Sequence, residues 1–221
     1  MPLQNRVTPR GDLIAVTARG ALMGNRGRLH DAARQIVRRQ VSSYRAWVTC
    51  LLAFKGRRRS VMSPGRYTEL FFLDEATALA AGHRPCGECR RADHMRFKTA
   101  WLTGNSGYGL APAVSIGAID RELHRDRLAA GGVQRTFASE VGELPDGTFI
   151  AREPQGVPLL IWGGALWPWS PEGYGDPESG RTHEVVTVLT PRSTVSAIAA
   201  GYVPGVDVSA GRPGTVSAKV R

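Results

Sequence analysis

Apolar residues occur along the first hundred positions in short runs separated by glycine, proline and charged residues, which indicates a mixed α+β protein. Residues 12–16 predict a short strand, and residues 18–29 a glycine-rich connection. Over residues 32–54 apolar side chains recur three and four positions apart with arginines between them, so this stretch predicts an amphipathic helix. Residues 67–73 predict a second strand, and the alanine-rich residues 76–81 a second helix.

The second half of the chain has a different pattern. Residues 102–115 are rich in Gly, Ser and Pro, and residues 116–130 predict a helix that ends at two glycines. Residues 133–169 alternate apolar runs with turns, as in an antiparallel meander, and residues 184–201 predict a strand and a helix. The predicted organisation is a basic zinc-binding region at 1–101, a linker or loop at 102–115, an α+β region with antiparallel strands at 116–208, and a disordered tail at 209–221.

The turn after the alanine-rich helix carries two of the three cysteines. Asp74 is placed to cap this helix and Gly82 to end it in a left-handed conformation. Cys86 and Cys89 then form C-x-x-C on a tight turn, where two sulfurs can bind one tetrahedral Zn²⁺. A redox pair uses the same spacing, and reduced thiols without metal are a further alternative. The remaining zinc ligands are expected among the other soft or borderline donors, with Cys50 and His83 favoured and His30 and His94 as alternates.

Residues 71–90, FFLDEATALAAGHRPCGECR, resemble the second half of the Ada-type metal-binding domain. That module forms the N-terminus of a bacterial methylphosphotriester DNA repair protein, and related copies are appended to some nucleases. The resemblance implies that both cysteines of the turn ligate zinc, and that the protein acts in DNA repair or processing. In the nuclease-linked copies a histidine begins an H-x-x-x-C pair, but here His30 is followed by Arg34 at the cysteine position, and an insertion carries Cys50. The implied ligand set is therefore rearranged, and methyl transfer is not carried over.

Charge is unevenly distributed. Residues 1–100 hold 19 Lys and Arg against 7 Asp and Glu, whereas residues 101–221 hold 10 against 12. A positive surface of this size attracts nucleic-acid phosphates, and DNA is favoured as the partner. A GC-rich genome is the competing explanation, because arginine outnumbers lysine 26 to 3. The candidate phosphate-binding residues are Lys55, Arg57, Arg58, Arg59, Arg90 and Arg91.

Composition places few other limits on the protein. A chain of 221 residues with 42% apolar content can bury a core. Three cysteines argue against a disulfide framework and for a reducing compartment. No apolar run approaches the ~20 residues that span a bilayer, so we expect a cytoplasmic protein without membrane contact. The oligomeric state is open.

Three functions of different classes fit these observations. The first is a zinc-stabilised nucleic-acid-binding protein with an arginine-rich surface. The second is an enzyme acting on nucleic acid or nucleotides, in which Asp120 orients His124, four positions later on one helix face, as a general base. The sequence lacks H-E-x-x-H and P-loop signatures, and its P-C-x-x-C is only the second half of a deaminase pattern. The third is a structural zinc module that mediates interactions without catalysis.

Overall fold

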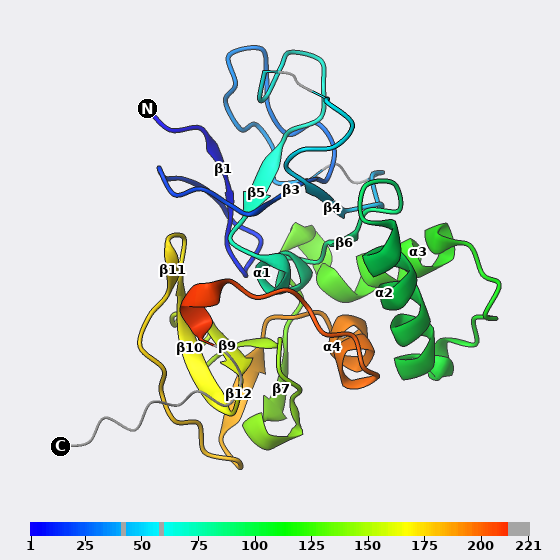
Figure 1. The fold of residues 1–221 in the computed structure, drawn as a ribbon, viewed down its shortest axis with the longest axis vertical. Coiled ribbons are helices and arrows are strands. Elements are labelled where there is room, and N and C mark those ends of the chain that lie inside the picture. Colours follow the sequence, from blue (N-terminus) through cyan, green and yellow to red (C-terminus); the bar gives the residue numbers. More distant parts are fainter. Residues whose placement is uncertain (41–42, 58–59, 212–221) are drawn as a thin grey trace.

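The computed structural model describes residues 1–40, 43–57 and 60–211. In this part of the chain, a mixed six-stranded sheet and an antiparallel six-stranded sheet are combined with four α-helices (Figure 1). This arrangement confirms the predicted α+β class and the antiparallel strands of the second half. No helix among the described residues has the length and apolar character needed to cross a membrane.

The first sheet has the strand order β2-β1-β5-β3-β4-β6. Two of its neighbouring pairs, β1 with β5 and β4 with β6, are parallel, and the others are antiparallel. Its strands are β1 (Gln4–Val7), β2 (Leu13–Ala15), β3 (Leu22–Asn25), β4 (Val48–Leu51), β5 (Leu70–Phe72) and β6 (Arg84–Pro85).

The second sheet has the order β11-β10-β9-β8-β12-β7 and is antiparallel throughout its described pairs. Its strands are β7 (Phe137–Glu140), β8 (Phe149–Ala151), β9 (Leu159–Trp162), β10 (Ala165–Ser170), β11 (Gly173–Tyr174) and β12 (Val185–Val188). The helices are α1 (Glu75–Ala80), α2 (Arg91–Gly104), α3 (Ile116–Arg127) and α4 (Arg192–Ala199). Figure 1 shows α1 in the middle, with α2, α3 and α4 gathered on one side.

Helix α1 is buried along its whole length, and its alanines and Leu79 face the core on several sides, while Glu75 and Thr77 are buried as well. Ala76 and Ala80 pack in one cluster with Phe149 of the second sheet. Ala78 belongs to the core of the first sheet, and Leu79 packs among residues of α2, α3 and α4. Small side chains let these surrounding elements approach the helix closely, so one short helix joins three parts of the core.

Two acidic residues at the start of α1 tie it to the second half of the chain. Asp74 accepts a hydrogen bond of 2.8 Å from the Thr77 backbone N–H, as predicted for the cap, and one of 2.7 Å from the Tyr174 hydroxyl. Glu75 accepts a hydrogen bond of 2.6 Å from the Tyr202 hydroxyl. These partners are 100 and 127 residues away along the chain. At the other end Gly82 has φ +80°, which confirms the left-handed helix stop.

The helix predicted over residues 32–54 is wrong. The described residues of this segment form no helix, and positions 41–42 lie outside the described residues. Val48–Leu51 is instead strand β4, with β3 on one side and β6 on the other. Strand β3 itself lies in the stretch predicted as a connection. The local apolar spacing fitted a helix, but pairing with distant strands decided the conformation.

Helix α2 was not predicted, and it extends into the stretch predicted as a linker. It packs on the C-terminal segment, where the Phe97 and Tyr202 rings lie 5.3 Å apart, and Trp101 is fully buried. The structure agrees with the other predicted strands and helices of the second half to within a few residues. Of the predicted tail, residues 212–221 lie outside the described residues.

Candidate metal centre

Parallel pairing of β4 and β6 brings the three cysteines together. Cys50 lies on β4, Cys86 follows β6, and Cys89 lies in the turn before α2. The Cys86 backbone N–H donates a hydrogen bond of 2.9 Å to the Thr49 carbonyl, which sets Cys86 beside Cys50. All three sulfurs lie within 4.8 Å of one another. Each cysteine is half-buried and none is in a disulfide.

The turn between the two C-x-x-C cysteines is held by its own hydrogen bonds. The Glu88 backbone N–H donates to the Cys86 sulfur at 3.4 Å, and the Arg90 N–H donates to the Cys86 carbonyl at 3.1 Å. Glu88 also forms a two-pronged ion pair with Arg57 from the loop after β4. The turn is therefore held by hydrogen bonds of its own and by the ion pair with Arg57, which lies on the loop that follows the strand of Cys50.

Hydrogen bonds between the three sulfurs shift the pKa values of the thiols. A hydrogen bond from the Cys50 thiol lowers the pKa of Cys86 to about 4, and the same bond, together with burial, raises the pKa of Cys50. Burial also raises the pKa of Cys89. One thiolate is thus stabilised by neighbouring thiols, whereas three thiolates so close together would repel one another. A divalent cation removes that repulsion, so this donor set fits a metal ion, and the cluster could bind one.

The histidines predicted as ligands lie elsewhere, and the group of donor atoms among the described residues contains cysteines alone. His83 is buried against Trp47 and Phe72, with ring centroids 5.1 and 4.8 Å away. His30 is engaged at both ring nitrogens, by the Thr68 hydroxyl at 2.7 Å and by a backbone carbonyl at 3.2 Å. His94 lies against the turn, with Nδ1 3.2 Å from the Pro85 carbonyl.

A cavity of about 870 Å³ opens beside the sulfurs. Its walls are largely apolar and aromatic, and all three cysteines contribute to them. The other residues that line it include Met23, Asn25, Val48, Phe54, Arg57, Tyr67, Glu69, Phe71 and Glu88. The size and lining are those of a small-molecule site. Sequence reasoning missed the contribution of β3, because the strand was taken for a connection.

The residues predicted to contact phosphate are in different environments. Lys55 and Arg91 are exposed, and Arg57 is exposed but paired with Glu88. Arg90 is buried, with its guanidinium 2.8 Å from Glu75 and 2.7 Å from Asp93. Arg90 is therefore an internal ion-pair residue and does not extend the positive surface as predicted. Positions 58 and 59, where Arg58 and Arg59 were predicted to contribute, lie outside the described residues.

The expected contact between Asp120 and His124 is wrong. Asp120 is buried and accepts two hydrogen bonds of 2.7 Å from the Arg84 guanidinium. Nδ1 of His124 instead lies 2.8 Å from the Arg127 guanidinium. The helical spacing was correct, but a buried arginine 36 residues away along the chain takes the carboxylate. A general base oriented by Asp120 is thus absent from this helix.

Comparison with known proteins gives no relative: no family model, no curated protein and no solved structure matches the chain. One feature implied by the resemblance to the Ada-type module is present in the structure, namely a cysteine cluster that could bind a metal ion.

Proposed function

We propose that Cys50, Cys86 and Cys89 hold a zinc ion that fixes the base of a nucleic-acid-binding surface. Three sulfur donors favour a soft or borderline metal, and zinc commonly binds such sets. The surface is formed by the described residues of two segments, which we call loop A (residues 26–47, between β3 and β4) and loop B (residues 52–69, between β4 and β5). Strand β4, which carries Cys50, is the short segment that joins them.

Direct contacts tie the two loops to each other. The Leu29 backbone N–H donates to the Thr68 hydroxyl at 2.8 Å, and the Thr68 N–H donates to the Gly27 carbonyl at 3.0 Å. His30 of loop A contacts both Thr68 and the Ser63 carbonyl of loop B. A metal that fastens β4 to the C-x-x-C turn would therefore restrain both loops together.

The charge of these loops is the observation that carries the proposal. Loops A and B hold eleven Lys and Arg against two Asp and Glu, in a chain whose total net charge is +10. Six of these cations are exposed and have no carboxylate partner among the residues that the structure describes: Arg28, Arg34, Arg38, Arg45, Lys55 and Arg66. Exposed, uncompensated guanidinium groups are suited to phosphate oxygens.

Fluorescence anisotropy with labelled duplex and single-stranded oligonucleotides tests this proposal. Affinity should fall steeply between about 50 and 200 mM salt, because each phosphate contact releases counterions. Arg28→Ala and Arg66→Ala, one on each loop, should each weaken binding. Each should also reduce the slope of the logarithm of the binding constant against the logarithm of salt concentration by about one. Arg121→Ala on the exposed face of α3 is the matched control and should change neither. Affinity that is independent of salt would exclude this function.

A second function is favoured by the cavity beside the sulfurs. A zinc ion held by these three cysteines would keep a fourth position, as in catalytic sites, and would supply Lewis-acid chemistry there. The apolar walls would exclude bulk water, and Asn25 could position a polar group of the substrate. Cobalt-substituted protein offers the test, because imidazole should shift its visible absorption bands if the fourth position exchanges. Bands that do not change on adding imidazole would remove the enzyme alternative.

A further inference from the structure

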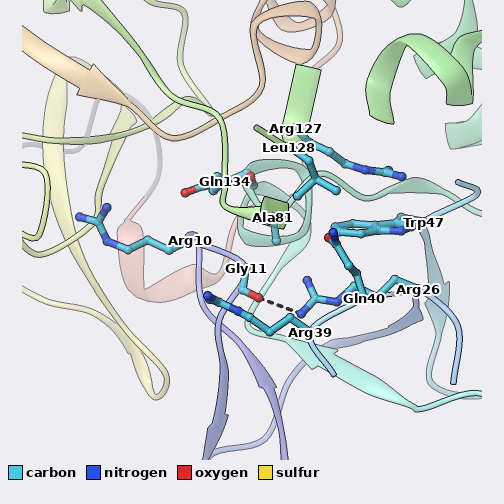
Figure 2. Close-up of a pocket in the computed structure, with 12 residues that line it drawn as sticks. Arg10, Gly11, Arg26, Arg39, Gln40, Trp47, Ala81, Arg127, Leu128 and Gln134 are labelled. Carbon is cyan, nitrogen blue, oxygen red and sulfur yellow. Dashed lines mark hydrogen bonds between the residues drawn. The ribbon is translucent and has the colours of Figure 1, made fainter. Parts of the chain in front are cut away.

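Two arginines are buried on opposite sides of Trp47, and neither lines the cavity beside the cysteines. The guanidinium carbon of Arg127 lies 3.8 Å from the centroid of the indole ring and that of Arg26 lies 5.0 Å from it. Figure 2 shows the two guanidinium groups above and below the ring. Each residue is only 2% exposed. The structure thus encloses two positive charges within a few ångströms of one aromatic side chain.

The neighbours of these arginines satisfy their hydrogen bonds only in part. Arg26 donates to the Gly11 carbonyl at 2.9 Å, and Arg127 donates to the Gly82 and Arg45 carbonyls at 2.9 and 2.8 Å. The Nε atom of each is buried without a hydrogen-bond partner among the described residues. Neither arginine has a carboxylate in ion-pair contact in that part of the chain, since Asp120 is occupied by Arg84.

Burial opposes the charge of both groups without removing it. It lowers the pKa of Arg26 to about 10 and that of Arg127 to about 9. Both side chains remain protonated at neutral pH. A buried cation without a counter-ion is strongly unfavourable, and contact with an aromatic face offsets only part of that cost. A bound anion would therefore stabilise the two buried guanidinium groups.

A cavity of about 30 Å³ lies among these residues. Arg10, Arg39 and the amide side chains of Gln40 and Gln134 also line it, and none of the described lining residues is acidic. Arg39 is paired with Asp12, whereas the Arg10 guanidinium donates to the Gly156 carbonyl and has no carboxylate partner among the described residues. The cavity is small, which limits a ligand to a small ion.

We propose that this cavity, the arginine cavity, binds a small inorganic oxyanion of the phosphate or sulfate type. The lining arginines and the amides of Gln40 and Gln134 would donate to its oxygens, and its charge would balance the enclosed guanidinium groups. Loop A, α3 and the loop before β2 all contribute to the cavity, so the ion would join segments far apart in the sequence. The proposal does not rest on zinc or on nucleic-acid binding.

Thermal unfolding in inorganic phosphate tests the proposal, with sodium chloride at the same ionic strength as reference. At low millimolar concentrations, below those at which such salts act on surface hydration, the Tm should rise with phosphate and saturate. Isothermal titration calorimetry should show one phosphate site per chain. A flat Tm and no binding heat would overturn the inference.

Matched variants locate the site. Arg26→Met and Arg127→Met should each weaken phosphate binding at least about tenfold, since each removes a charge-assisted donor. Arg121→Met on the exposed face of α3 should bind phosphate like the wild type. If the buried variants fail to fold, Gln40→Glu decides, because a carboxylate at the half-buried edge of the cavity supplies the missing counter-charge. That variant should fold and lose the phosphate response, and an unchanged response in it would contradict the inference.

Discussion

Removing the carboxylate of Asp120 should destabilise the protein severely. Both Asp120 and Arg84 have side chains that are 6% exposed, and two hydrogen bonds of 2.7 Å join them. Asp120→Ala leaves the Arg84 guanidinium buried without this counter-charge. Breaking a buried pair from one side typically costs about 3–5 kcal/mol. For a chain of this size each kcal/mol lowers Tm by about 2–4 °C, so the expected decrease is roughly 6–20 °C.

Urea unfolding followed by circular dichroism measures this loss. Glu122→Ala is the control on the same helix, because it removes the partner of the exposed Arg125 and should cost no more than about 1 kcal/mol. The double variant Arg84→Met/Asp120→Leu should recover most of the loss, since it removes both buried charges. The reasoning is refuted if Asp120→Ala is no less stable than the control, or if the double variant is less stable than the single one.

Two further perturbations follow from the core. Burial holds the pKa of His83 well below its usual value, so only the unfolded chain gains its proton as pH falls through about 6.5. The free energy of unfolding of the wild type, measured by urea titration at each pH, should therefore decrease below a pH of about 6.5 relative to that of His83→Phe. The same pH dependence in both proteins would contradict this. In Gly24→Ala, the added Cβ would collide with the Val48 carbonyl between β3 and β4. This variant should lose cooperative unfolding, whereas Gly107→Ala, which meets no neighbour, should keep it.

Local signals predicted the centre of the molecule well. The Asp74 cap, the alanine-rich helix, the Gly82 stop and the C-x-x-C turn all depend on neighbours within a few residues. The pairing of Cys50 with this turn was anticipated only as one of several ligand options. It arises from the parallel contact of β4 with β6, and no local pattern encodes such a contact.

The errors have the same physical origin. Residues 32–54 have helical spacing, yet Val48 and Thr49 pair with strands that lie before and after them in sequence. The apolar residues of helix α2 are not gathered on one face, and its burial depends on packing against the C-terminal segment. The positive charge of the first half was also partly misread, because Arg26 and Arg90 are interior residues. Composition counts charges but does not say which of them reach the surface.

Elemental analysis of the purified protein, with thiol counting before and after chelation, tests the metal centre most directly. We expect one zinc ion per chain, protection of all three cysteines, and loss of both in Cys50→Ser. His83→Phe and His94→Ala should retain the metal, because neither histidine belongs to the cluster of donor atoms. A folded wild-type protein without metal, or full zinc content in folded Cys50→Ser, would contradict this expectation.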